Sequence, residues 1–300
     1  MAAVEHSQGD GLLTPEQLES FSEQGFLVLR DFASPQEVAA LKARGCELLA
    51  QFEPDASSSV FSTRNQTAKT DRYFLDSANN VSFFFEEKAF DGEGKLVKPK
   101  AQAINKIGHA MHDLDPVFRS FSRSPKMCRL LADLGYRRPL PMQSMYITKQ
   151  PGIGGEVVPH QDSSFLHTTP LSVVGVWLAL EDATKENGCL WALPGSHKAG
   201  LQRRFLRAPD GAVSFDRDTA EVPDTGFVPV EAPAGTLVVI HGEVLHMSKE
   251  NTSPVSRHAY TVHLVEGAPG VTWSPENWLH RSSDFPPQPL FDRTTEAAVH

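Results

Sequence analysis

Hydrophobic and polar positions follow two different patterns along the chain. Between residues 14 and 135, apolar residues tend to recur three and four positions apart, as they do on one face of an amphipathic helix. From about residue 140, short apolar runs separated by glycine, proline and asparagine replace that spacing. We therefore expect a mainly β protein with flanking helices, most of them in the N-terminal half.

Helix starts are marked by capping boxes at 14–17 and 34–37. Each places a hydroxyl residue before a proline, with glutamine or glutamate three positions later. We expect a helix from each start, a short strand over 26–29 between them, and further helical turns over 104–112 and 116–134. A polar loop is expected over 53–70, followed by a hairpin that pairs 73–75 with 81–85.

The C-terminal half carries a series of strand-like runs, at 143–148, 173–180, 189–193, 227–230, 237–240 and 259–265. Many short strands punctuated by turn residues are typical of a jelly roll, the double-stranded β-helix of cupin-like proteins. We expect a single domain over 1–300, with 14–135 as mostly helical support, 140–266 as the jelly-roll core and 281–300 as a polar tail.

Composition and charge narrow the function. The chain is 40% hydrophobic and 22% charged, as in an ordinary globular enzyme. Its formal net charge of −9 disfavours a nucleic-acid partner, which would require clustered positive charge. No apolar stretch approaches the length of a membrane span, and no signal peptide or disulfide framework is evident. These features predict a cytoplasmic protein that acts on a small molecule, and we expect a monomer.

The candidate chemistry begins at His160 and Asp162, within a run that includes a glycine-rich turn. In an extended segment these two side chains project to one face, because alternate residues share a face of a strand. An imidazole and a carboxylate are two of the three ligands of the facial triad that binds non-haem Fe(II). His246, just after the apolar run at 237–240, is the candidate for the third ligand.

A second histidine and carboxylate pair leaves an alternative open. His241 and Glu243 have the same spacing, with His258 or His263 as a third ligand. Zinc also accepts histidine and aspartate, so a zinc hydrolase is a further alternative, although it would not explain Arg257. A cupin-like protein that binds a ligand without turnover is the alternative from outside the enzymes.

Arg257 is the candidate for binding a distant carboxylate of an oxoacid cosubstrate. A guanidinium suits this role because it stays charged and binds a carboxylate through two parallel hydrogen bonds. Arg257 is expected on a strand that returns beside His246 in a tight antiparallel pair, with the hydroxyl of Ser248 on the same face as His246. Neither residue alone would indicate such a site.

Several motifs together resemble the phytanoyl-CoA dioxygenase family, whose members are Fe(II)- and 2-oxoglutarate-dependent oxygenases. The resemblance rests on His160-Gln-Asp162, on His246-x-Ser248 with Arg257, and on the segments at 105–110, 143–147, 175–177, 181–183, 187–190, 194–197 and 272–278. It implies a double-stranded β-helix, bound iron, and 2-oxoglutarate and molecular oxygen as cosubstrates. Because Asp162 is present, and related iron halogenases lack this carboxylate, it implies hydroxylation.

The resemblance also implies roles for individual residues. It places His160, Asp162 and His246 on iron, and Arg257 and Ser248 on the far carboxylate of 2-oxoglutarate. It adds Lys106, Met145 and Trp177 to the cosubstrate pocket, where a shift of one residue would exchange Met145 for Tyr146. Taken alone, Trp177 would be barrel core and Lys106 a solvated helix residue. We expect hydroxylation of a small organic substrate, and the family name suggests a lipid- or acyl-related one.

Overall fold

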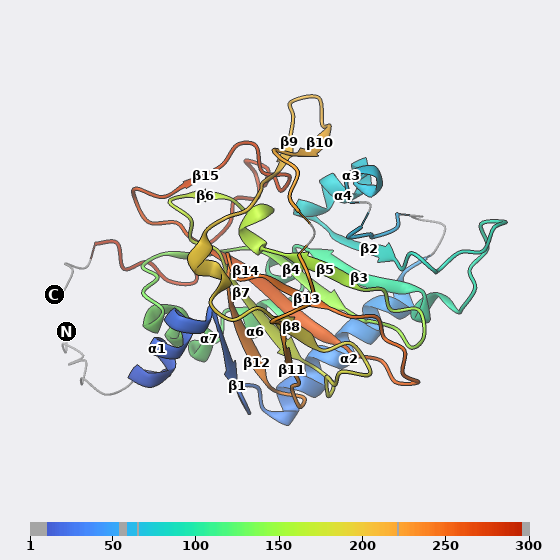
Figure 1. The fold of residues 1–300 in the computed structure, drawn as a ribbon, viewed down its shortest axis with the longest axis horizontal. Coiled ribbons are helices and arrows are strands. Elements are labelled where there is room, and N and C mark those ends of the chain that lie inside the picture. The colour runs from blue at the N-terminus through green and yellow to red at the C-terminus, as the bar shows by residue number, and fades with distance from the viewer. Residues whose placement is uncertain (1–10, 54–58, 65, 221, 296–300) are drawn as a thin grey trace.

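Two antiparallel sheets form the jelly-roll core of the protein (Figure 1). The computed structural model describes residues 11–53, 59–64, 66–220 and 222–295. The seven-stranded sheet has the order β1 (Phe26–Leu29), β12 (Leu237–His241), β7 (Val174–Ala179), β14 (Ala259–Glu266), β4 (Pro139–Ile147), β3 (Ile104–His109) and β2 (Val81–Phe85). The four-stranded sheet has the order β11 (Val228–Val230), β8 (Leu190–Ala192), β13 (His246–Ser248) and β5 (Val157–His160).

Two small ribbons extend this core. One pairs β9 (Phe205–Arg207) with β10 (Val213–Phe215), and the other pairs β6 (Thr168–Thr169) with β15 (Thr272–Trp273). The hairpin of β9 and β10 projects beyond both sheets at the top of Figure 1. The expected strands in the C-terminal half are all present, and the structure adds these ribbons together with β5 and β13.

Alternation along the strands explains how the seven-stranded sheet packs on both faces. One set of residues joins the hydrophobic cluster shared with the helices: Val174, Val176, Leu178, Leu237, Val239, Tyr260, Val262 and Leu264. Of the residues between them, Trp177, Val238 and Ile240 pack instead with Leu190 and Val230 of the four-stranded sheet. The interior between the sheets is therefore lined by every second residue of β7, β12 and β14.

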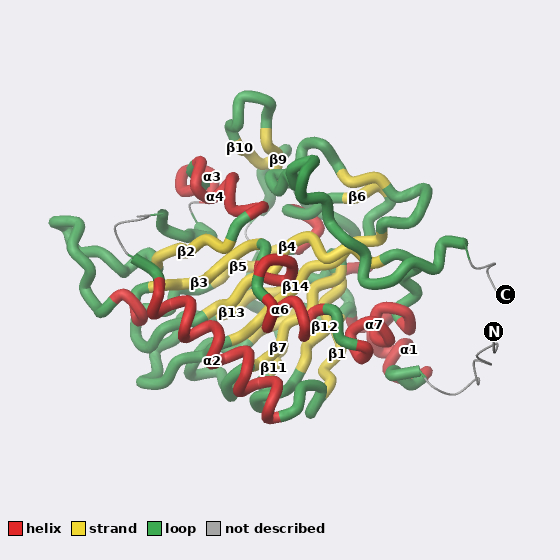
Figure 2. The backbone as a smooth tube through the Cα atoms, turned by 180° about the vertical axis from the view of Figure 1, so that it is seen from behind, coloured by secondary structure: helices red, strands yellow, loops and turns green. Residues whose placement is uncertain are grey.

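Most of the helices cover the outer face of the seven-stranded sheet, but the helix over Arg72–Asp76 packs elsewhere, because its Phe74 and Leu75 belong to a separate cluster with Phe84 and Trp278. The helices are α1 (Pro15–Gln24), α2 (Pro35–Gln51), α3 (Gln66–Lys69), α4 (Arg72–Asp76), α5 (Met111–Leu114), α6 (Pro116–Ser122) and α7 (Pro125–Asp133). Both expected capping boxes are confirmed at the starts of α1 and α2. Figure 2 shows α2 and α6 lying across this sheet, where Leu41, Leu49 and Phe118 join the shared cluster.

Two expected elements in the N-terminal half were wrong. Residues 104–109 form β3 rather than a helix, and helical structure begins only at Met111. Ile104 and Ile107 are spaced like one face of a helix, but both are buried in the strand because a register shift between Phe84 and Phe85 interrupts the pairing of β2 with β3. The expected hairpin is also absent, because 73–75 belong to α4, whose N-terminus is capped by the Asp71 carboxylate.

The expected polar loop and the expected C-terminal tail are described only in part. Residues 54–58 and 65 of the expected polar loop, and 296–300 of the expected tail, lie outside the described residues. The described part of the tail packs on the body of the protein: Arg281 pairs with Asp113, and Leu290 and Phe291 contact the main core cluster. In the part of the chain that the structure describes, no helix is both long and apolar enough to cross a membrane.

The contact between α2 and β4 generates a test of the fold. A Cβ atom added to Gly45 would lie 2.3 Å from the ring of Tyr146, which is fully buried and bonded through its hydroxyl to His258 at 2.7 Å. Alanine normally stabilises a helix relative to glycine, but here we expect Gly45→Ala to lower the free energy of unfolding by about 1–3 kcal/mol through overpacking. Urea titration measures this difference.

Gly92→Ala is the matched control, because no atom lies within 4 Å of its added Cβ. We expect its free energy of unfolding to stay within about 0.5 kcal/mol of the wild type. A Gly45→Ala protein as stable as the wild type would show that α2 does not press on Tyr146 as described.

Candidate metal and cosubstrate site

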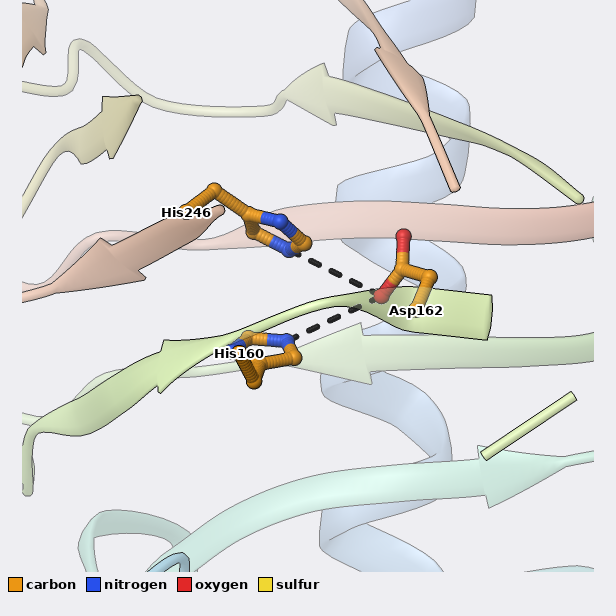
Figure 3. Close-up of side chains that lie close together, drawn as sticks. All are labelled: His160, Asp162 and His246. Atoms are coloured by element: carbon orange, nitrogen blue, oxygen red, sulfur yellow. Dashed lines mark ion pairs between the residues drawn. The ribbon is translucent and has the colours of Figure 1, made fainter. Parts of the chain in front are cut away.

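Three side chains converge where the four-stranded sheet borders the interior (Figure 3). His160 is the last residue of β5, Asp162 begins the next helical turn, and His246 is the first residue of β13. Pairing of the two strands places His246 directly opposite His160. Among the described residues, these are the histidine, cysteine and carboxylate side chains that converge closely enough to hold a metal ion, with ligand atoms within 4.8 Å of one another.

The distances fit a shared cation better than direct hydrogen bonds. The Nε2 atoms of His160 and His246 lie 3.7 Å and 3.6 Å from the same oxygen of Asp162, Oδ1. Gln161 points away from the cluster, and its amide donates to the carbonyls of Gly200 and Glu243. This orientation confirms the expectation that His160 and Asp162 project together while the residue between them does not.

The ring orientations of both histidines suit metal binding. Nδ1 of His160 lies 2.9 Å from the carbonyl of Val158, and Nδ1 of His246 lies 3.2 Å from the carbonyl of Val244. Donation from Nδ1 to a carbonyl fixes the tautomer and leaves the lone pair of Nε2 directed at the cluster. Burial, reinforced by the His246 ring, lowers the pKa of His160 to about 3, so its imidazole is neutral, as a metal ligand must be.

The carboxylate of Asp162 has a second neighbour. His263 on β14 places its Nε2 3.2 Å from Oδ2, the oxygen that does not face the other two histidines. Burial raises the pKa of Asp162, but the imidazoles of His263 and His246 more than offset this and hold it well below its usual range. On β7, a Cβ atom added to Gly175 would lie 2.9 Å from Oδ2, so the absence of a side chain there leaves space for the carboxylate.

The alternative cluster does not assemble in the described part of the chain. The ring of His241 packs against Phe21, with ring centroids 6.0 Å apart, while His258 bonds to Tyr146 and His263 lies beside Asp162. Glu243 therefore has no set of converging ligands around it.

Arg257 lies at another part of the same cavity as the three converging side chains. Its side chain is only 1% exposed, its Nε donates to the carbonyl of Gly188 at 3.1 Å, and its Nη1 is buried with no partner among the described residues. Burial lowers the pKa of Arg257 to about 10, so the guanidinium remains charged at neutral pH. Burying a charged donor without an acceptor lowers the stability of the fold, unless a bound anion accepts its hydrogen bond.

The route by which Arg257 reaches the cavity differs from the expectation. We expected it on a strand paired with that of His246, but β13 and β14 belong to different sheets. Arg257 precedes β14 and enters the cavity from the facing seven-stranded sheet, whereas Ser248 lines it from β13.

The other residues implied by the family resemblance also line the cavity. Trp177 is 3% exposed, with the Arg257 guanidinium 5.3 Å from its ring centroid. Of the two neighbouring residues left open by the sequence, Met145 lines the cavity, whereas Tyr146 faces the helices. Lys106 is neither solvated nor helical: it is 4% exposed on β3, with Nζ 3.2 Å from the ring centroid of Phe61. Burial lowers the pKa of Lys106 well below its usual value.

Sequence reasoning missed several residues of the cavity wall, including Asn105, Gln143 and Thr261. It named His263 only as a ligand of the alternative cluster. Alternation along a strand could have predicted Thr261 and His263. Both are an even number of positions from Arg257, on the strand predicted just after it, so they share its face.

Comparison with known proteins identifies the family. A model of the phytanoyl-CoA dioxygenase family matches residues 21–259. The chain belongs to this family. A phytanoyl-CoA dioxygenase of Arabidopsis thaliana is 54% identical over 281 residues, which cover 94% of this chain and 98% of the plant protein. Phytanoyl-CoA dioxygenase domain-containing protein 1 of Bos taurus is 47% identical over 289 residues, covering 93% and 99% of the two chains.

A solved structure shares the fold. The crystal structure of SnoK, a non-haem α-ketoglutarate-dependent carbocyclase of nogalamycin biosynthesis, superposes with a TM-score of 0.61 at 21% identity, covering 93% of each chain. The expected jelly-roll fold and the expected family are thereby confirmed. As a member of the phytanoyl-CoA dioxygenase family, the protein is a 2-oxoglutarate-dependent non-haem iron dioxygenase.

Metal binding tests the converging side chains directly. We expect Asp162→Ala to weaken Fe(II) binding by at least about 100-fold, because it removes a direct ligand and leaves His263 without its partner. Calorimetric titration with Fe(II) in the absence of oxygen measures the affinity, and circular dichroism checks that the variant is folded.

His241→Gln is the matched control because it alters the alternative histidine and leaves the converging group intact. Its Fe(II) affinity should equal that of the wild type. Loss of binding in His241→Gln, with retention in Asp162→Ala, would move the metal site to the alternative cluster.

Proposed function

We propose that the protein couples the decarboxylation of 2-oxoglutarate to succinate with the hydroxylation of a small organic substrate. In this proposal His160, Asp162 and His246 hold Fe(II), which supplies the redox chemistry that activates dioxygen. Arg257 and Ser248 bind the far carboxylate of 2-oxoglutarate. Lys106, Met145 and Trp177 complete the wall around the cosubstrate.

The observation that carries the proposal is the unsatisfied Nη1 of Arg257, buried in the same cavity as the metal-binding group. A metal site alone would also suit a hydrolase or a binding protein. Neither explains why a charged donor is buried at the cavity wall with Nη1 unsatisfied. A dicarboxylate explains both features, because one end can reach the metal while the other accepts from the guanidinium.

The cavity wall supports this division of roles. Trp177 holds one face of the guanidinium, and the carbonyl of Gly188 holds its Nε, so rotation of Arg257 is restricted before any ligand binds. A restricted, desolvated cation binds an anion more strongly than one exposed to water, because less solvent must be displaced. The burial of Asp162 and His246, each 6% exposed, likewise limits access of bulk water to the reacting groups.

The presence of Asp162 favours hydroxylation. A carboxylate at this position occupies the site that a halide would need on the metal. The part of the cavity outside the cosubstrate wall is lined by apolar side chains, among them Phe61, Leu166 and Trp278. We infer a substrate with a hydrocarbon portion, and we assign no acyl-coenzyme A. A cytoplasmic location and a monomeric state stay predictions of the sequence.

The cosubstrate role of Arg257 has a direct kinetic test. We expect Arg257→Ala to raise the KM for 2-oxoglutarate at least about thirtyfold, the lower end of the 2–5 kcal/mol that follows removal of one partner of a desolvated charge pair. Arg257→Lys should recover only part of this loss, because an ammonium cannot form the parallel pair of bonds. Succinate formation as a function of 2-oxoglutarate concentration measures both variants.

Arg119→Ala is the control for loss of a positive charge, since Arg119 is exposed on α6, away from the cavity. Its KM should be unchanged. If Arg257→Ala binds Fe(II) normally and keeps the wild-type KM, then Arg257 does not bind the cosubstrate. If well-folded, iron-loaded wild type forms no succinate, the protein is a binding protein and the proposed activity is wrong.

A further inference from the structure

A second, outer hollow of about 710 Å³ lies beside the cavity that contains the metal-binding group. The two spaces share part of their lining: Val157, Val158, His160, Phe165, Arg203, Met247 and Ser248. Arg203 is thus at the boundary between them, just before the projecting hairpin of β9 and β10 (Figure 1). A ligand in either space can therefore contact this side chain.

The Arg203 guanidinium is held in place but has no anionic partner in contact. Its Cζ lies 3.7 Å from the ring centroid of Phe215 on β10, a stacked arrangement that leaves the N–H edge free. Within the described residues it forms no hydrogen bond or ion pair. Its two neighbouring arginines do: Arg204 pairs with Glu276 at 3.2 Å, and Arg207 donates to the carbonyl of Trp278 at 3.4 Å.

The acidic residues near Arg203 do not neutralise it at close range. Asp216 accepts a hydrogen bond of 2.8 Å from the backbone N–H of Arg204 and pairs with Arg217 at 3.1 Å. Asp218 is exposed and attracts Arg203 only at longer range. The stacked guanidinium therefore keeps its hydrogen-bonding capacity for a ligand.

The other basic side chains of the cavity wall already have roles or partners. Arg257 has its place in the proposed cosubstrate site, and Lys106 lies over the Phe61 ring. Lys149 donates to the carbonyls of Gly155 at 2.8 Å and Lys249 at 2.6 Å. Asp162 is the carboxylate among the described lining residues of the cavity, and its close neighbours are histidines.

An apolar surface connects Arg203 with the metal-binding group. The ring of Phe165 lies 6.1 Å from that of His160 and 6.2 Å from that of Phe215, measured between centroids. A molecule lying along Phe165 would have one end beside the metal-binding group and the other beside the guanidinium. This arrangement would select a substrate by both its hydrocarbon portion and its charge.

We propose that Arg203 determines substrate specificity by binding a carboxylate or phosphate group of the substrate, whose hydrocarbon portion lies against Phe165. The substrate class is thus an organic anion. The statement that this anion is hydroxylated rests on the proposed function, whereas the statement that it binds at Arg203 does not.

The test measures binding of probes with one chain length and different head groups. The full-length protein is titrated calorimetrically with octanoate, octyl phosphate and neutral octanamide, in the Arg257→Ala background so that the cosubstrate site does not compete. We expect one or both anions to bind at least about tenfold more tightly than octanamide, as charge-assisted hydrogen bonds would give. Arg203→Gln should abolish this preference, and Arg204→Gln, whose arginine is already paired, should keep it.

The outcomes separate the two proposals. A preference for octanoate alone identifies a carboxylic acid substrate, and a preference for octyl phosphate alone identifies a phosphate ester. Equal binding of anions and octanamide, or an anion preference that persists in Arg203→Gln, overturns the assignment of Arg203. Binding of 2-oxoglutarate and formation of succinate by the wild type are measured separately, so failure of the proposed activity would leave the binding result interpretable.

Discussion

Antiparallel pairing of β5 with β13 is the interaction on which the site depends. These strands are far apart in sequence, and their register places His246 opposite His160. Opposed residues in such a pair project to the same face about 5 Å apart, which lets two imidazoles face one carboxylate oxygen. Asp162 completes the group because the chain remains extended through Gln161, whose own side chain is anchored on the other face by Gly200 and Glu243. A shift of one residue in this register would direct one histidine away from the carboxylate.

The second sheet contributes charge rather than metal ligands. His263 from β14 supports the outer oxygen of Asp162, and Arg257, just before β14, faces the same cavity. Folding must therefore bury a carboxylate and a guanidinium without pairing them with each other, an arrangement that costs stability. The cost is reduced for Asp162 by the surrounding imidazoles, but the Nη1 of Arg257 has no such compensation within the described residues. In the proposed function, a bound dicarboxylate would supply the missing acceptor, and its affinity would come from that uncompensated group.

Much of this arrangement could be predicted from the sequence, and the errors have physical causes. Capping boxes mark α1 and α2 because they satisfy local backbone donors, so no distant contact is needed to recognise them. The run at 104–109 was misassigned because its isoleucines, three positions apart, fit a helix as well as an interrupted strand. Arg257 lines the cavity, but the expected strand pairing was wrong, since spacing along the chain cannot reveal which of two facing sheets a strand joins. Lys106 shows the limit most clearly, because burial of a lysine depends on aromatic neighbours from other segments.

The division of residues between strands and connecting segments explains why the activity could be inferred more readily than the substrate. The metal-binding residues lie on or beside paired strands, where register fixes them to one another. Arg203 and Phe165 instead lie in connections, and their relation to each other passes through the ring of Phe215 on a projecting hairpin. Connections of this kind change length and composition without disturbing the sheets, so the same core accommodates different substrates. Under the proposed role of Arg203, the choice of substrate therefore rests on connecting segments, while the paired strands position the group proposed to hold the metal.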